Sequence, residues 1–453
     1  AEHFNSILNR VSTISDEAID LLPQRPIREE LDDTPTEAKI TKAVRQLSSG
    51  KAAGADGLPA EIYKSGSQPV AMELTWLFNV IWDREAVPQE FKDALLVHLF
   101  KHEGNRHICD NHRGISPLTI AGKFLAKIII NRLTATSAVE VILKSQCRFC
   151  TLRGTTNMLF LARQVQEKCV EQNMELFMVF VDLRKAFDSV SREGLWKILA
   201  KAGCPPRLVN IICSFPDGMV GRVVDQGSLS APFKVGNGTN QGCVMAPLLF
   251  SIVFSAMLHD AFKDCDKGVM ICFRSDGVFF NLKRLQAKTK TSSLLLRELL
   301  YTDDCALIVH SFEDAQPIVD NFSRACCRYG LTISIKKTEV LHQPRPGQPP
   351  CSQSITVGRK ELKSVEKFCY LGGILAQNPR INDEITARSA YGRLQYCLWS
   401  DGGIRLSTKV QLYKTVVLST LLYGCECQSI EAVPPMLPAQ DLQHDLEGQG
   451  TQY

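Results

Sequence analysis

Apolar side chains recur along this chain at spacings typical of helices and of strands. Helical spacing predicts a helix within 36–50 that ends at a Ser-Ser-Gly stretch, a second over 71–82 and a third over 117–133. In the third segment the apolar residues form one stripe, and cations such as Lys123 and Arg132 remain for the opposite face. We therefore expect an amphipathic helix there.

Two short apolar runs predict strands. The run over 176–183 is continuous and ends in a carboxylate, which is typical of a fully buried strand. The run over 299–310 is interrupted by Thr-Asp-Asp and predicts two strands joined by a tight turn. Between these runs, Ser191 is placed to cap a helix that stops at Gly203.

Length and composition indicate two or three folded domains with a real core. The chain has 453 residues, of which 45% are hydrophobic and 22% are charged. A Pro- and Gly-rich stretch over 343–353 predicts a linker, and 355–424 predicts a short β segment followed by helices. The Pro- and Gln-rich end, 431–453, has no periodicity and is expected to be disordered.

Charge and cysteine content restrict the cellular setting. The net charge of +4 permits a nucleic-acid partner without requiring one. Seventeen scattered cysteines, with no secretory signal before them, favour a reducing intracellular setting with mostly free, buried thiols. The longest apolar run, 243–258, is short for a bilayer span, so no membrane segment is expected.

Three aspartates carry the candidate chemistry. Asp182 ends the predicted buried strand, and Asp303 and Asp304 lie in the predicted turn. Two-metal nucleotidyl transfer needs such carboxylates, because two hard cations about 3.5–4 Å apart require oxygen ligands. An Asp pair is also common in ordinary turns, so these residues alone leave a purely structural explanation open.

Eight segments in order along the chain resemble the reverse transcriptases of non-LTR, LINE-type retrotransposons, and most of all the RTE-like group. The segments are GKAAGADGLPAEIY, NHRGISPLTIAGKFLAKIIINRL, SQCRFCTLRGTTNM, MVFVDLRKAFDSVSREGLWKIL, NGTNQGCVMAPLLFSIVFSAML, LLYTDDCALIVH, YGLTISIKKTEVL and KFCYLGGIL. The resemblance extends from about residue 1 to 427. It implies an RNA-directed DNA polymerase that acts on an RNA template, a DNA primer and dNTPs.

The resemblance also implies roles for individual residues. Asp182 and Asp303 would bridge two Mg²⁺ or Mn²⁺ ions, with Asp304 beside them, and Phe187 would exclude a ribose 2′-hydroxyl. The other residues implied to bind the incoming nucleotide are Arg113, Gln241, Gly242 and Lys337, the last near the leaving pyrophosphate. Template contacts would come from Asp56, Gln146, Phe149 and Arg153, and the hairpin that grips the primer end would contain Phe368, Tyr370, Leu371 and Gly372.

The implied fold is an α+β right-hand polymerase with fingers, a palm built on an antiparallel sheet, and a helical thumb. Residues 1–50 would be a helical lead-in, 51–345 the fingers and palm, 355–430 a thumb-like region, and 431–453 a tail. The groove would hold an RNA–DNA hybrid through its phosphates and shape. The protein would act in the nucleus or the cytoplasm.

Several positions depart from the family pattern. Thr302 stands where Ala is usual in the turn and His112 stands where Tyr is usual, while the segment 148–153 lacks basic residues and glycines that the family carries there. An alternative is therefore a catalytically inactive, retroelement-derived nucleic-acid-binding protein. A second alternative, another metal-dependent phosphotransferase such as a nuclease, leaves Phe187 and the Asn-Gln-Gly turn unexplained.

Overall fold

The computed structural model describes most of the chain, which forms two compact units. It describes residues 1–10, 12–50, 52–54, 56–102, 104–116, 118–136, 154–225, 227–238, 244–274, 291–378 and 402–423. Unit 1 contains 1–151, 176–340 and 351–364, and unit 2 contains 152–175, 341–350 and 365–453.

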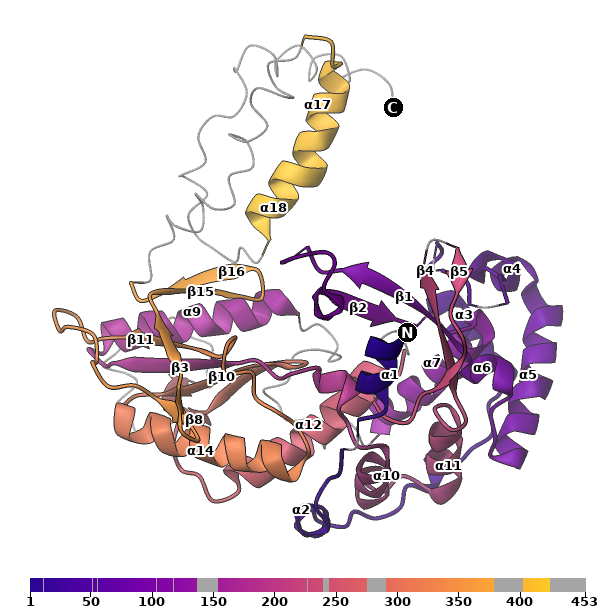
Figure 1. The fold of residues 1–453 in the computed structure, drawn as a ribbon, viewed down its shortest axis with the longest axis horizontal. Coiled ribbons are helices and arrows are strands. Elements are labelled where there is room, and N and C mark those ends of the chain that lie inside the picture. Colours follow the sequence, from indigo (N-terminus) through magenta and orange to yellow (C-terminus); the bar gives the residue numbers. More distant parts are fainter. Residues whose placement is uncertain are drawn as a thin grey trace. The chain divides into compact units, whose positions relative to one another are not determined.

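Unit 1 combines helices with two larger sheets (Figure 1). Its helices are α1 (Glu2–Leu8), α2 (Asp16–Asp20), α3 (Glu37–Gln46), α4 (Ala60–Ser65), α5 (Ser67–Arg84), α6 (Gln89–Lys92), α7 (Ile120–Thr136), α10 (Arg192–Lys201), α11 (Pro206–Ser214), α12 (Ala246–Phe262) and α14 (Phe312–Arg328). Single 3₁₀ turns are η1 (Glu29–Leu31), η2 (Cys109–Asn111) and η3 (Ala186–Asp188). The mixture of helices and largely antiparallel strands makes the chain an α+β protein.

One sheet is built on two buried antiparallel strands. Its order is β14-β11-β3-β10-β9, with the bounds β14 (Lys363–Val365), β11 (Glu339–Gln343), β3 (Leu176–Val181), β10 (Asp304–Val309) and β9 (Glu298–Tyr301). All six residues of β3 are buried, as are all residues of β10 after the first. The predicted buried strand and the predicted hairpin are both confirmed, and they are neighbours in this sheet.

The other larger sheet contains both parallel and antiparallel pairs. Its strands are β1 (Ala94–Phe100), β2 (His112–Ile115), β4 (Val220–Asp225), β5 (Ser228–Leu229) and β6 (Phe233–Lys234). β1 pairs with β2 antiparallel and with β4 parallel. Small two-stranded pairs in unit 1 are β7 (Val269–Arg274) with β8 (Thr291–Leu296), and β12 (Thr356–Val357) with β13 (Lys360–Glu361).

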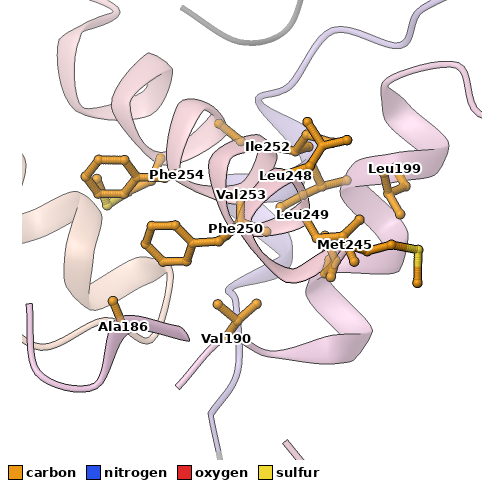
Figure 2. Close-up of a cluster of buried hydrophobic side chains, with 14 of the residues drawn as sticks. Ala186, Val190, Leu199, Met245, Leu248, Leu249, Phe250, Ile252, Val253 and Phe254 are labelled. Carbon is orange, nitrogen blue, oxygen red and sulfur yellow. The ribbon is translucent and has the colours of Figure 1, made fainter. Parts of the chain in front are cut away.

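The core of unit 1 surrounds α12. This helix is apolar on nearly every side, and fourteen of its seventeen residues are buried. Figure 2 shows its side chains Leu248, Phe250 and Phe254 within a cluster that includes Ala186 and Val190. The ring of Phe250 stacks on that of Phe254 at a centroid distance of 5.5 Å. A helix buried all round fixes the segments that pack against it, among them η3.

Local signals explain the ends of α10. The Ser191 side chain accepts a hydrogen bond from the Gly194 amide, as the predicted cap requires. At the other end Gly203 adopts φ +87°, and the Cys204 amide donates to the Leu199 carbonyl. A left-handed residue after the last turn is the usual way to end a helix, and it favours glycine.

The prediction of an amphipathic helix over 117–133 was wrong in one respect. The helix forms, as α7, but Lys123 and Arg132 are both buried. The Lys123 ammonium donates to the Ala52 carbonyl at 2.8 Å. Arg132 donates to the Leu31 carbonyl and lies 4.4 Å from the ring centroid of Trp82. Long cationic side chains can cover apolar surface when carbonyls and aromatic rings receive their heads, which periodicity cannot reveal.

Unit 2 contains a helix, a hairpin and a short helical segment. Its elements are α9 (Thr155–Glu171), β15 (Lys367–Tyr370), β16 (Gly373–Ala376), α17 (Leu406–Leu412), the π-helical turn η5 (Tyr413–Leu418) and α18 (Ser419–Leu422). The buried Gln166 side chain of α9 donates to the Ala376 carbonyl at 2.9 Å. Gly373 packs so closely on Leu159 that a Cβ there would lie 2.3 Å from its Cδ2 atom. These contacts fix the hairpin on α9.

None of the helices in the described ranges is both long and apolar enough to cross a membrane.

We predict that Gly203→Ala lowers the free energy of unfolding by about 3 kcal/mol, because the left-handed φ disfavours a Cβ and the added atom has no room. A Cβ at Gly203 would lie 2.3 Å from the Pro26 carbonyl oxygen. Gly358→Ala is the matched control, since Gly358 has φ +63° with nothing within 4 Å, and should cost only about 1 kcal/mol. Urea unfolding of both variants tests this. Equal losses would show that the clash with Pro26 is absent.

Candidate active site

Two aspartates come together because of the register of β3 and β10. Val181 pairs with Cys305, and Asp304 pairs with Tyr301 across the β9–β10 turn. Extending the first register by one residue places Asp182 opposite Asp304, and Asp303 lies in the turn beside them. Like charges directly opposite each other in a sheet repel, so this arrangement needs compensating positive charge.

The backbone of Asp182 is held by a third segment of unit 1. The Asp182 amide donates to the Thr338 hydroxyl at 3.2 Å. Its carbonyl accepts from the Ser334 amide at 2.8 Å. The neighbouring Leu183 forms an isolated antiparallel bridge with Ile333. The backbone of Asp182 is therefore held by the segment 333–338 on one side of its strand.

The Asp182 carboxyl is poorly solvated. Burial raises its pKa above the usual range, and the charges of Lys337 and Lys101 and a hydrogen bond from the Ser334 side chain act in the opposite direction. A half-buried carboxylate of this kind is well placed to gain from an added cation.

The turn between β9 and β10 has an unusual backbone. Thr302 adopts φ +64° and its side chain is almost wholly buried, with 1% exposed. Positive φ at the first position of a two-residue hairpin loop is typical of a type II′ turn, where glycine is preferred. A β-branched residue there is strained, and strain of this kind persists only when surrounding contacts impose it.

A cluster of cations from separate segments lies around Asp182. Apart from burial, the pKa of Lys101 is lowered by the charges of Lys337, Arg113 and Lys185. Lys101 directly follows β1, and Arg113 lies on β2 opposite Leu99. The Lys101 amide donates to the Asn111 carbonyl at 2.8 Å, which continues the β1–β2 ladder and places Lys101 on the same face as Arg113.

Phe187 rests on the central core helix. Its ring centroid lies 4.6 Å from that of Phe250, which is fully buried. Phe187 is itself only partly buried and belongs to η3, five residues after Asp182. The core therefore supports one side of the ring and leaves part of it accessible.

Asp56 occupies a turn before α4. Its carboxylate accepts from the Leu58 amide at 3.3 Å, and its charge contributes to the raised pKa of Tyr63. Gly54 is in the same segment, where a Cβ would lie 2.5 Å from the Thr119 Cα. The structure thus explains Asp56 by turn geometry and Gly54 by its close approach to Thr119, and the template contact of Asp56 stays a prediction.

Five predicted site residues lie outside the described residues: Gln146, Phe149, Arg153, Gln241 and Gly242. The segment 148–153, with its departures from the family pattern, lies there too.

The candidate primer-end hairpin is well defined within unit 2. Phe368 and Tyr370 belong to β15, and the loop residues Leu371 and Gly372 have φ +48° and +82°. Two positive φ values in a two-residue loop are typical of a type I′ turn. The Tyr423 hydroxyl donates to the Leu371 carbonyl at 3.1 Å. The predicted hairpin forms, and its role at a primer end stays a prediction.

The donor set of unit 1 suits a hard divalent cation. Asp182, Asp303 and Asp304 offer only carboxylate oxygens, which Mg²⁺ and Mn²⁺ prefer. Added positive charge would also reduce the repulsion between the opposed carboxylates, of which Asp182 is partly desolvated. Within the described ranges no group of three His, Cys, Asp or Glu side chains already has the arrangement of a metal site. The fit is therefore one of chemistry, and the ligand geometry is a prediction.

The family follows from a comparison with known proteins. The family model described as "Reverse transcriptase (RNA-dependent DNA polymerase)" matches residues 100–375, which is more than half of the chain. The chain belongs to the reverse transcriptase family. The matched range contains β3, β10, the aspartates and the cation cluster.

Curated relatives come from mobile elements. The RNA-directed DNA polymerase from mobile element jockey of Drosophila melanogaster is 24% identical over 403 residues, covering 87% of this chain and 41% of that protein. The probable RNA-directed DNA polymerase from transposon BS of the same organism is 23% identical, covering 91% and 43%. The retrovirus-related Pol polyprotein from type-1 retrotransposable element R2 of Bradysia coprophila is 21% identical, covering 77% and 36%. The resemblance to LINE-type reverse transcriptases is confirmed, and the chain spans about two-fifths of the length of these relatives.

Three charged residues near the candidate site were not anticipated from the sequence. Lys101 lies between the segments that resemble the family, while Lys185 and Asp188 lie inside one of them. The sequence does give one signal for each residue: Lys101 directly follows an apolar strand, and Lys185 and Asp188 follow Asp182 closely. Burial raises the pKa of Asp188 to about 6, although the charges of Lys185 and Lys101 oppose the shift.

We predict that Asp188 makes stability pH-dependent between about pH 4 and pH 6. Its pKa is about 6 in the folded protein against an ordinary value of 3.8. The folded state therefore retains a proton that the unfolded state has lost, so this contribution is complete below pH 4 and disappears as pH rises through 6. The shift corresponds to about 3 kcal/mol.

The measurement is urea unfolding of the parent and of Asp188→Asn from pH 4 to pH 7. The difference in unfolding free energy, parent minus variant, should fall by about 3 kcal/mol across that range. A difference that does not vary with pH would contradict the raised pKa.

Proposed function

We propose that this chain carries the RNA-directed DNA polymerase of a non-LTR retrotransposon, which adds dNTPs to a DNA primer on an RNA template. The observation that carries the proposal is the register that sets Asp182 opposite Asp304. The charges of Lys101 and Lys337 act on Asp182, and that of Arg113 acts on Lys101. Opposed carboxylates beside a group of cations match a reaction between a metal-bound hydroxyl and a triphosphate.

Asp182 and Asp303 would hold two Mg²⁺ or Mn²⁺ ions, with Asp304 beside them. When bound, the ions lower the pKa of the primer 3′-hydroxyl and neutralise charge on the triphosphate. The protein's own part is to position the carboxylates, and the backbone bonds to Ser334 and Thr338 do so for Asp182.

Cations of the cluster would bind the triphosphate. Arg113 and Lys101 share one face of the β1–β2 ladder, so both can present donors to phosphate oxygens. Lys337 acts on Asp182 electrostatically and would lie near the leaving pyrophosphate. Gln241 and Gly242 would contact the incoming nucleotide through their backbone.

Phe187 would select deoxyribonucleotides by exclusion. Its ring is supported by Phe250, which cannot move aside because it is fully buried. A 2′-hydroxyl on the sugar above the ring would then have no space.

The larger architecture would be a right hand. Residues 51–345 would form fingers and palm around the antiparallel pair β3–β10, after the lead-in 1–50, and 355–430 a thumb. Asp56, Gln146, Phe149 and Arg153 would contact the template, and the hairpin from Phe368 to Gly372 the primer end. An intracellular site of action, nuclear or cytoplasmic, is consistent with the free cysteines among the described residues.

We predict that Asp182→Asn reduces primer extension on an RNA template with Mg²⁺ by about a thousandfold, because a ligand of both metals is lost. Asp303→Asn should act similarly. Asp264→Asn is the control, since Asp264 is an exposed carboxylate just beyond α12 and should leave extension unchanged. A parent protein that binds template–primer but extends nothing would support the inactive alternative.

We also predict that Phe187→Ala incorporates ribonucleotides about tenfold more readily relative to deoxyribonucleotides, because removal of the ring opens the space for a 2′-hydroxyl. Extension with dNTPs should fall by less. The ratio of kcat/KM for rNTP and dNTP gives the result. An unchanged ratio would mean that Phe187 serves only the contact with Phe250.

A further inference from the structure

One cation of the cluster, Lys185, has a fixed backbone and a partly exposed side chain. It precedes η3 and adopts φ +48°, a left-handed conformation that is strained for a lysine. Its carbonyl accepts from the amides of Asp188 at 2.9 Å and Ser189 at 3.0 Å. The Lys185 backbone is therefore fixed three residues after Asp182, and its ammonium group can reorient by rotation of the side chain.

The ammonium group of Lys185 is paired with Asp110. The Nζ and Oδ1 atoms are 3.1 Å apart, and the side chains are 40% and 69% exposed. Asp110 belongs to η2, in the connection between β1 and β2. The hydrogen bond and charge of Lys185 are the main causes of the lowered pKa of Asp110.

A second lysine and a histidine ring also approach Asp110. The Lys101 ammonium donates to the backbone carbonyl of Asp110 at 2.7 Å, and the His3 ring nitrogen lies 3.7 Å from its Oδ1. Lys185, Arg113 and Lys337 all act on Lys101 as like charges. These cations are thus close enough to repel one another, and an incoming polyanion would relieve that repulsion.

We propose that Lys185 is a further triphosphate-binding residue, and that Asp110 holds its ammonium group until a nucleoside triphosphate displaces the carboxylate. This inference rests on the proposed function, since it concerns the same nucleotide site. It adds a ligand that the family resemblance did not assign and gives Asp110 the role of a built-in competitor.

The energies favour such an exchange. An exposed ion pair such as Lys185–Asp110 contributes little to stability, because water screens both charges. A triphosphate carries more charge and several strong acceptors, so the lysine gains more from it than it loses. Because the Lys185 backbone is fixed, only side-chain torsions need to change.

A purely structural tie between η2 and the start of η3 is the competing explanation. In that case loss of either partner would have the same effect. In the exchange, loss of Lys185 weakens nucleotide binding, whereas loss of the Asp110 charge removes a competitor. Asp110→Asn therefore separates the two explanations.

The experiment measures the Kd of a non-hydrolysable dNTP analogue by titration calorimetry, with template–primer and Mg²⁺, and the KM for the dNTP in primer extension. Lys185→Ala should raise both about tenfold with a smaller change in kcat, and Lys185→Arg should restore most of the loss. Asp110→Asn should give values at or below those of the parent.

Lys197→Ala is the matched control. Lys197 pairs with Asp16 at 2.7 Å, with 43% and 79% exposure, on the unit's surface helices α10 and α2. Its removal should leave Kd and KM unchanged. An unchanged Kd in Lys185→Ala, or an equal rise of Kd in Asp110→Asn, would overturn the inference.

The two measurements also separate this inference from the proposed function. Lys185-dependent binding of the analogue by a parent protein that extends no primer would uphold the inference and refute the polymerase activity. Normal extension with a Kd independent of Lys185 would do the reverse.

Discussion

The antiparallel register between β3 and β10 decides where the charges of this site lie. Both strands are buried on both faces, so alternation of apolar and polar side chains cannot set their register. The tight turn at Thr302–Asp303 fixes β10 against β9, and the bonds of Asp182 to Ser334 and Thr338 hold the end of β3. A slip of one residue would turn Asp304 to the opposite face.

That register places two carboxylates opposite each other, and the cations that offset their repulsion come from segments outside these two strands. Asp182 is desolvated and faces Asp304, and the opposing cations come from the end of β1, from β2 and from the segment after Ile333. These cations stabilise ionised Asp182 but also repel one another, and burial together with this repulsion lowers the pKa of Lys101. Opposed anions beside crowded cations are unfavourable in the protein alone, and the proposed metal and triphosphate would make the same arrangement favourable.

Local signals in the sequence predicted the elements that carry the aspartates. The apolar run before Asp182, the turn at Asp303 and the ends of α10 each depend on neighbours within a few residues, and all were confirmed. The burial of Arg132 was not predictable, because its partners Leu31 and Trp82 are distant in sequence. The place of Lys101 in the cation cluster was not predictable either, because the other cations of that cluster belong to segments distant in sequence.

Phe187 and the lysines would discriminate by different physical means. The Phe187 ring rests on Phe250, whose own ring stacks on Phe254 inside the core, so moving it would require moving close-packed residues. Lys185 and Lys337 end in exposed ammonium groups on flexible stems. Selection by shape needs a rigid ring, because a ring that moves aside excludes nothing. Charge neutralisation tolerates a flexible side chain, because a cation can follow phosphate oxygens as they separate. The same turn after β3 supplies both kinds, since Lys185 and Phe187 are two residues apart on either side of Ala186.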